Sequence, residues 1–177
     1  KWQPASRTVP PYSDHPEYIE ALAQSVERAY AAEKDRPEIL VCSYHGVPKR
    51  YLLEGDPYHC QCQKTTRLLR ERLGWAKTEI ITTFQSRFGR EEWLKPYTVE
   101  EVARLAKEDG KKRIAVVAPA FSADCIETLE EINGEIREAF EHAGGEHFVY
   151  VPCLNDDDAH ISALSTIITE NLKGWLE

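Results

Sequence analysis

Residues 113–119 read RIAVVAP, an uninterrupted apolar run that is typical of a buried β-strand. Three further runs have a similar character, namely EILVCSY (38–44), EIITTF (79–84) and HFVYVP (147–152). Strands that are apolar on both faces belong to sheets that helices cover from both sides. The four runs therefore predict a parallel sheet in the interior of the chain.

The segments between these runs have the spacing of α-helices. Helices are predicted over 16–33, over 57–73, from Thr98 to Gly110, over 124–142 and near the end of the chain. Strands that alternate with helices of this length imply βαβ units with right-handed crossovers. The expected fold class is α/β, a parallel four-stranded sheet flanked by helices on both faces, as in Rossmann-like and flavodoxin-like domains.

Two apolar patterns describe the last two helices. The helix over 124–142 carries one stripe of the kind that packs on a core, made of Ile126, Leu129, Ile132, Ile136 and Phe140. The closing helix is marked by Ile161, Leu164, Ile168, Leu172 and Trp175.

The length and the ends of the chain indicate one domain with an arm. A chain of 177 residues fits a single domain, which we place at 16–177. Residues 1–15 are rich in proline and lack periodicity, so we interpret them as a linker from something upstream. The chain contains no Met and starts at Lys1, and we therefore expect the true start of the protein to lie upstream.

The composition excludes several classes of protein. With 22 Lys and Arg against 30 Asp and Glu, the net charge of −8 disfavours a nucleic-acid partner. No apolar run approaches the roughly 20 residues of a membrane-spanning helix. Five scattered cysteines without a secretion signal predict free thiols and a cytoplasmic protein.

Candidate site residues follow from the rule that ligands of open parallel sheets bind beyond the carboxyl ends of the strands. His45 is the one histidine at such an end, and its imidazole suits proton transfer or metal binding at neutral pH. Glu127 lies one turn into the long helix. It either forms a capping box with Asp124 or faces His45, and the spacing alone leaves both interpretations open.

Other motifs in the sequence are weaker indications of function. His59-Cys60-Gln61-Cys62 has the residue types of a soft-metal site, but on a helix the two thiols would point about 200° apart, so no metal is expected there. Gly-rich phosphate loops and the GxSxG motif are absent from the sequence. The acidic residues of 127–141 are interpreted as a solvated helix face.

Three long runs resemble the ferrochelatases, the enzymes that insert Fe²⁺ into protoporphyrin. They are SYHGVPKRYLLEGDPY (43–58), TFQSRFGREEWLKPYT (83–98) and APAFSADCIETLEEI (118–132). RTVPPY (7–12) is similar to the segment between the two halves of these enzymes, and PCLND (152–156) also fits. The resemblance implies a chelatase-like C-terminal half of bacterial type. A missing N-terminal half would supply the other wall of the porphyrin cleft, so the fragment alone is expected to be inactive.

The same resemblance assigns roles to residues. The catalytic histidine falls on His45 and its acidic partner on Glu127, and this pair takes pyrrole protons and handles the substrate iron. Positions near the porphyrin fall on Tyr58, Gln85, Ser86, Trp93 and Phe121, with Ser86 meeting a propionate, and the aspartate before the catalytic glutamate falls on Asp124. Four cations after strand ends predict a basic rim for the dicarboxylate porphyrin, namely Lys49, Arg50, Arg87 and Arg90.

Two departures from the family limit what is carried over. Cys125 stands where many members have histidine, which puts a combined His and Glu route for iron in doubt. The cysteine-rich extension of animal members is missing, so no iron–sulfur cluster and no required cofactor are expected. Peripheral membrane contact is implied mainly for the missing half. The alternatives are another tetrapyrrole chelatase, for cobalt or nickel, and a non-catalytic porphyrin- or metal-binding module.

Overall fold

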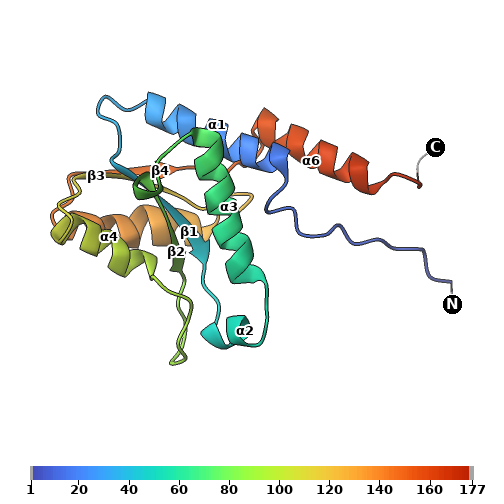
Figure 1. Ribbon diagram of the computed structural model, residues 1–177, viewed down its shortest axis with the longest axis horizontal. Helices are drawn as coiled ribbons and strands as arrows, with labels where there is room; N and C mark the ends of the chain where they lie inside the picture. Colours follow the sequence, from blue (N-terminus) through green and yellow to red (C-terminus); the bar gives the residue numbers. More distant parts are fainter. Residues whose placement is uncertain (1, 176–177) are drawn as a thin grey trace.

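The computed structural model describes residues 2–175 (Figure 1). In this part of the chain, four strands form one sheet: β1 (Ile39–His45), β2 (Ile80–Gln85), β3 (Arg113–Val117) and β4 (His147–Val151). Their spatial order is β2-β1-β3-β4, and every neighbouring pair is parallel. The predicted α/β class and the four predicted strands are confirmed.

Helices cover both faces of this sheet, as predicted. In chain order they are α1 (Pro16–Ala31), α2 (Lys49–Leu53), α3 (Tyr58–Leu73), the 3₁₀ turn η1 (Lys77–Glu79), α4 (Thr98–Lys107), the π-helix η2 (Glu127–Ile136), α5 (Arg137–His142) and α6 (Asp158–Asn171). The helices α1 and α3 pack on one face, and α4, η2 and α5 pack on the other. The last helix, α6, packs against α1. The short elements α2 and η1 were not predicted.

The alternation of side chains along β1 shows why both faces need a cover. Leu40, Cys42 and Tyr44 belong to the core on the side of α1 and α3. Ile39 and Val41 belong to the core on the side of α4 and α5. Burying an apolar side chain of this size contributes about 1.5–3 kcal/mol, so each face loses much stability if its helices are removed.

The predicted helix over 124–142 is divided into the π-helix η2 and the α-helix α5. Ile132, Ile136 and Phe140 are fully buried as predicted, whereas Ile126 is 65% exposed and Leu129 is 52% exposed. A π-helix has a wider turn, because each N–H bonds five residues back. Ile132 and Ile136, which are four residues apart, therefore lie on the same buried face of η2. Ile126 and Leu129 do not lie on this face, so the prediction that they pack on the core was wrong.

Both ends of the described chain lie on the same side of the domain (Figure 1). The arm before α1 has no regular secondary structure, and its Arg7 donates a hydrogen bond to the Asn171 carbonyl at 2.6 Å. The guanidinium also lies over the Trp175 ring, 4.7 Å from its centroid. None of the helices within residues 2–175 is long and apolar enough to cross a membrane.

Candidate active site at the carboxyl edge of the sheet

His45 is the last residue of β1, and its ring is held by the turn that follows. The Nδ1 atom donates to the Gly46 carbonyl at 2.6 Å. A carbonyl only accepts, so Nδ1 carries the proton and Nε2 of the neutral ring keeps a free lone pair. Gly46 makes this turn close, since a Cβ there would lie 2.8 Å from the Gln85 carbonyl oxygen. The fold thus sets the tautomer of His45 that can accept a proton.

Three of the predicted porphyrin residues surround His45. The ring centroids of Trp93 and Phe121 lie 6.2 Å and 6.4 Å from that of His45, and both rings are tilted. The Tyr58 hydroxyl donates to the His45 carbonyl at 2.8 Å. These side chains come from three different segments after strand ends, as the rule for parallel sheets predicts.

Gln85 joins this group to the π-helix. It is the last residue of β2, pairs with His45 across the sheet, and is only 4% exposed. Its Oε1 accepts from the Ser43 hydroxyl at 2.7 Å, and its Nε2 donates to the Glu127 carbonyl at 2.8 Å. A buried amide with both ends bonded is a rigid link, so Gln85 sets the distance between the strand ends and η2.

Glu127 begins η2 with a partly exposed carboxylate. A hydrogen bond from the Cys125 thiol lowers its pKa, as do its own backbone N–H and, when the ring is protonated, the charge of His45. The carboxylate is therefore ionised at neutral pH and lies within the electrostatic reach of His45. The two residues that were predicted to act together thus come from β1 and η2, close enough for the charge of one to influence the pKa of the other.

Asp124 makes different hydrogen bonds from those of the predicted capping box. Its carboxylate accepts hydrogen bonds from the hydroxyls of Tyr150 and Thr128, the Asn155 amide at 2.8 Å and the Cys153 N–H at 3.2 Å. Burial alone would raise its pKa, but these donors outweigh burial and the pKa is lowered. The Asp124 N–H donates to the Asn155 Oδ1 at 2.8 Å and not to the Glu127 carboxylate, so the capping-box interpretation of Asp124 and Glu127 was wrong.

Ser86 follows β2 with a left-handed backbone, at a φ of 62°. The carboxylate of Glu131 holds it, accepting from the Ser86 N–H at 2.6 Å and from its hydroxyl at 2.5 Å. The same carboxylate accepts from Gln85 Nε2 at 3.0 Å. Sequence reasoning missed Glu131 because it treated this acidic stretch as a solvated face. Its spacing of four from Glu127 was the available signal.

The rim around this site is less basic than predicted. Lys49 pairs with Glu92 at 3.1 Å, and Arg50 pairs with Glu91 at 2.7 Å. The Arg87 guanidinium lies over the Tyr97 ring, 4.9 Å from its centroid. A small cavity of about 240 Å³ beside Ser86 is lined by Arg87 on one side and by Glu131 and Glu135 on the other. Carboxylates thus pair with two of the four predicted cations, Lys49 and Arg50.

The cysteines are free and mostly buried. Burial raises the pKa of Cys42, Cys62 and Cys153 to about 12, which keeps these thiols protonated. Cys60 is exposed while Cys62 is buried, so the two thiols of the motif diverge as predicted. Within residues 2–175, no cluster of three or more His, Cys, Asp or Glu side chains is arranged to hold a metal.

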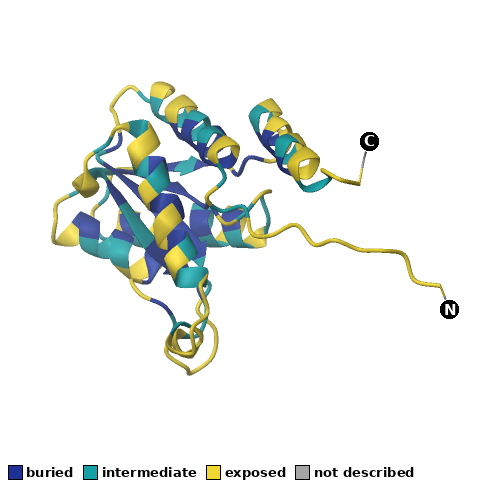
Figure 2. Cartoon of the chain, turned by 45° about the vertical axis from the view of Figure 1, so that its right-hand side comes forward, coloured by how far each residue is buried: buried dark blue, intermediate teal, exposed yellow. Residues whose placement is uncertain are grey.

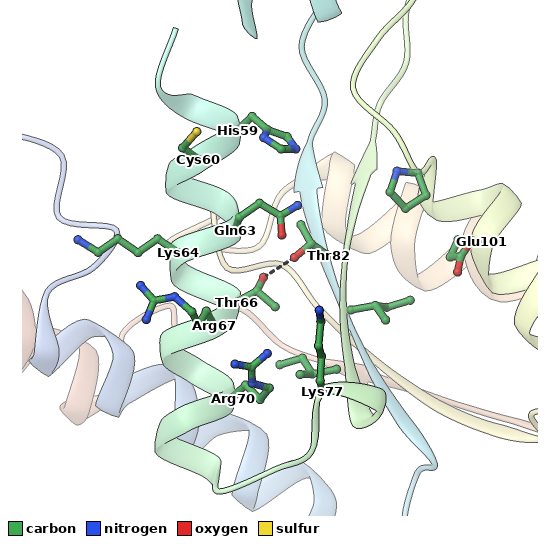
Figure 3. A pocket seen from close by; sticks show the side chains of 13 residues that line it. His59, Cys60, Gln63, Lys64, Thr66, Arg67, Arg70, Lys77, Thr82 and Glu101 are labelled. Carbon is green, nitrogen blue, oxygen red and sulfur yellow. Dashed lines mark hydrogen bonds between the residues drawn. The ribbon is translucent and has the colours of Figure 1, made fainter. Parts of the chain in front are cut away.

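A larger cavity of about 880 Å³ lies between α3 and β2 (Figure 3), and His45 is not among its lining residues. Its lining is mainly basic and polar, and includes His59, Cys60, Lys64, Arg67, Arg70 and Lys77. Lys64 and Arg67 are paired with Asp14 and Glu71. None of the residues predicted for the site lines this cavity, so the predicted chemistry stays at the carboxyl edge of the sheet.

Comparison with known proteins supports one family. A family model described as Ferrochelatase matches residues 1–172. The chain is 73% identical over all of its 177 residues to a Ferrochelatase of Rhodobacter capsulatus, and 58% identical over 176 residues to one of Allorhizobium ampelinum. It covers 50% and 51% of these proteins. The chain therefore spans about half the length of the curated relatives it matches.

A solved structure of similar fold is that of SirB from Bacillus subtilis with Fe³⁺. The TM-score is 0.60 at 16% sequence identity, over 86% of this chain and 54% of the other. At this identity the likeness concerns the fold alone, and it supports the α/β arrangement of the sheet and its helices.

Proposed function

The chain belongs to the ferrochelatase family, and from this premise we propose that it forms the C-terminal half of an enzyme that inserts Fe²⁺ into protoporphyrin IX to give protoheme. Residues 16–177 are the catalytic half-domain, and residues 1–15 connect it to an N-terminal half. The length of the relatives supports this division. The N-terminal half would close the other side of the porphyrin cleft, so the 177-residue chain alone is expected to lack turnover.

The reaction exchanges two pyrrole protons for one metal ion, and it needs groups that accept protons beside the macrocycle. The free Nε2 of His45 is suited to take one of them. The ionised Glu127 carboxylate offers an oxygen ligand to Fe²⁺ and a second place for a proton. The observation that carries the proposal is this pair, an imidazole with one free ring nitrogen and an ionised carboxylate within its electrostatic reach.

The surface around the pair suits a large flat apolar substrate. Leu53 and Phe88, on the segments that follow β1 and β2, are 76% and 82% exposed, and Ile126 beside η2 is also exposed. Together with Trp93 and Phe121 they supply apolar contact area, which a macrocycle could bury against a second wall. Ser86 is proposed to meet a propionate, for which it must exchange its bond to Glu131.

The test is metal insertion by the full-length protein, measured by porphyrin absorption with Fe²⁺ and with Zn²⁺. The H45A variant should lose at least about 100-fold in rate, because a positioned proton acceptor contributes on that scale. H142A, at an exposed histidine on α5, should keep the wild-type rate. Full turnover by H45A would refute the catalytic assignment, and a preference for Co²⁺ or Ni²⁺ would favour another tetrapyrrole chelatase.

No resident cofactor is part of this proposal, and iron enters as a substrate. We assign the protein to the cytoplasm, which the five free thiols support, because a reducing compartment keeps thiols unpaired. Any peripheral membrane contact is assigned mainly to the N-terminal half.

A further inference from the structure

Three hydroxyl groups are buried together beneath the site, in the sheet that Figure 2 shows as the buried centre of the domain. Ser43 of β1, Thr83 of β2 and Thr98, the first residue of α4, are each 0% exposed. The Thr98 oxygen lies 2.8 Å from that of Ser43 and donates to that of Thr83 at 2.9 Å. We call these three residues the hydroxyl cluster. Buried polar groups are costly unless they are hydrogen-bonded, so the cluster must serve an arrangement that uses its bonds.

The hydroxyl cluster lies directly behind the strand ends that carry the site. Side chains two residues apart on a strand share a face, so Ser43 lies on the same face of β1 as His45. Across the sheet Ser43 pairs with Thr83, and His45 pairs with Gln85. Val41 shares this face and packs in the core on the side of α4 and η2. The cluster therefore lies between the site and the helices that cover this face.

The Ser43 hydroxyl fixes the orientation of the Gln85 amide. The Glu127 carbonyl and the Glu131 carboxylate accept from this amide at 2.8 Å and 3.0 Å, so its NH₂ end faces η2. Its oxygen then faces Ser43, whose hydroxyl donates to it at 2.7 Å. A reversed amide would place its oxygen against two acceptors and its NH₂ group against a donor. With Ser43 in place, one orientation of Gln85 satisfies all of these groups.

Thr98 supports the Ser43 hydroxyl from the side of α4. Because the single proton of Ser43 goes to Gln85, its oxygen is left as an acceptor. Thr98 also has one proton, which the oxygens of Ser43 and Thr83 share. Thr83 in turn donates to the Cys42 carbonyl at 3.3 Å. Each hydroxyl proton of the cluster has an acceptor, and a satisfied buried network of this kind is rigid.

We propose that Ser43 and Thr98 are positioning residues for metal insertion, whose hydroxyls act through Gln85 on the place of Glu127 beside His45. This inference rests on the proposed function and deepens it. Both hydroxyls are fully buried, so they do not touch the substrate. Gln85 transmits their effect because it is bonded to Ser43 at one end and to the start of η2 at the other. A reacting group that is misplaced by about 1 Å can lose roughly 100-fold in rate.

The first test measures zinc insertion into porphyrin by four variants of the full-length protein. S43A removes the donor to Gln85, and T98V replaces a hydroxyl by a methyl group of similar size. T98S keeps the hydroxyl. T66V is the matched control, because Thr66 is also buried and its hydroxyl bonds to that of Tyr44 at 2.9 Å, on the opposite face of the sheet.

The rate and the local order of η2 should respond together. We expect S43A to lose at least about tenfold in kcat and T98V about threefold or more, with the KM for porphyrin changed less than about twofold. T98S should recover the rate lost in T98V. T66V should lower the Tm and keep the wild-type kcat. Amide exchange in residues 127–131 should be about tenfold faster in S43A than in T66V, because Gln85 no longer holds the start of η2.

The second test combines S43A with E127Q. If Ser43 acts through Glu127, the double variant should insert metal at the rate of E127Q alone. A further fall by the factor that S43A causes in the wild type would overturn the proposal. Equal kcat values for S43A and T66V would also overturn it, as would equal values for T98V and T98S.

The exchange measurement does not depend on turnover and separates the two proposals. Wild-type protein that inserts no metal would refute the proposed function, whatever the exchange rates are. An active wild type together with wild-type exchange in residues 127–131 of S43A would refute only the positioning roles of Ser43 and Thr98.

Discussion

Glu131 holds Ser86 by two hydrogen bonds, accepting from its N–H at 2.6 Å and from its hydroxyl at 2.5 Å. The contact links the π-helix to a residue with a left-handed backbone immediately after β2. A left-handed conformation is costly for a residue other than glycine, so it persists only where its surroundings hold it. Glu131 is the group that does so, and it acts through Ser86 and Gln85.

The E131Q variant should therefore be destabilised by about 1–3 kcal/mol, since an amide has one acceptor oxygen for three donors. In the full-length protein we also expect a raised KM for porphyrin with kcat changed less, because Ser86 would lose its position. E138Q, at an exposed carboxylate on α5, is the control. Chemical denaturation and steady-state kinetics measure the two effects. An unchanged denaturation midpoint would show that Glu131 does not hold the turn.

Glu127 should matter for turnover and hardly for folding. Since it forms no cap, E127Q is expected to keep the Tm within about 2 °C of wild type. Metal insertion should fall about 100-fold or more, because the neutral amide neither accepts a proton nor carries charge. E130Q changes an exposed neighbour on the same helix and should leave both quantities unchanged. Normal activity in E127Q would remove Glu127 from the mechanism.

Asp124 should make stability depend on acid pH. Its pKa in the folded protein lies below the ordinary value of 3.8, so ionised Asp124 stabilises the fold above that pH. This contribution is lost as the pH falls through the lower folded pKa. D124N should cost about 1–3 kcal/mol at neutral pH, through its weaker hydrogen bonds. Urea unfolding from about pH 7 to about pH 3 should show the gap between wild type and D124N narrowing, and a constant gap would contradict this account.

Gly46 is predicted to tolerate no side chain. In G46A the new Cβ would lie 2.8 Å from the Gln85 carbonyl oxygen and 3.0 Å from the Trp93 ring. We expect a loss of about 1–3 kcal/mol and a disturbed His45 ring. Gly134 in η2 has no atom within 4 Å of a Cβ, so G134A should be neutral or stabilising by about 0.5–1 kcal/mol. Equal unfolding free energies for the two variants would refute the close approach at Gly46.

Much of the fold could be predicted because burial in this protein follows simple periods. The four apolar runs became the four strands, and their ends shifted by only a few residues. The error at Ile126 and Leu129 arose because a stripe at 3.6 residues a turn describes an α-helix, while the π-helix buries residues four apart. The apolar pattern of the closing helix was also only partly a buried one, since Ile161 and Ile168 are each 52% exposed.

The candidate site divides in the same way. His45 and the residues after the strand ends could be located because parallel topology brings those ends together. The role of Glu131 could not be derived, because an acidic residue on a helix is most often solvated and only a tertiary contact distinguishes it. The salt bridges that balance Lys49 and Arg50 also depend on loop conformation, which no sequence period describes.

The tie between Arg7 and the end of α6 has a practical consequence for engineering. Because it holds Arg7 beside the end of α6, a peptide that leads from this end to Arg7 would need little reach, and the half-domain is a natural subject for circular permutation. The same contact places an affinity tag or a fused reporter that follows α6 beside the arm. New ends opened at the exposed loop around Gly110 would leave that contact clear.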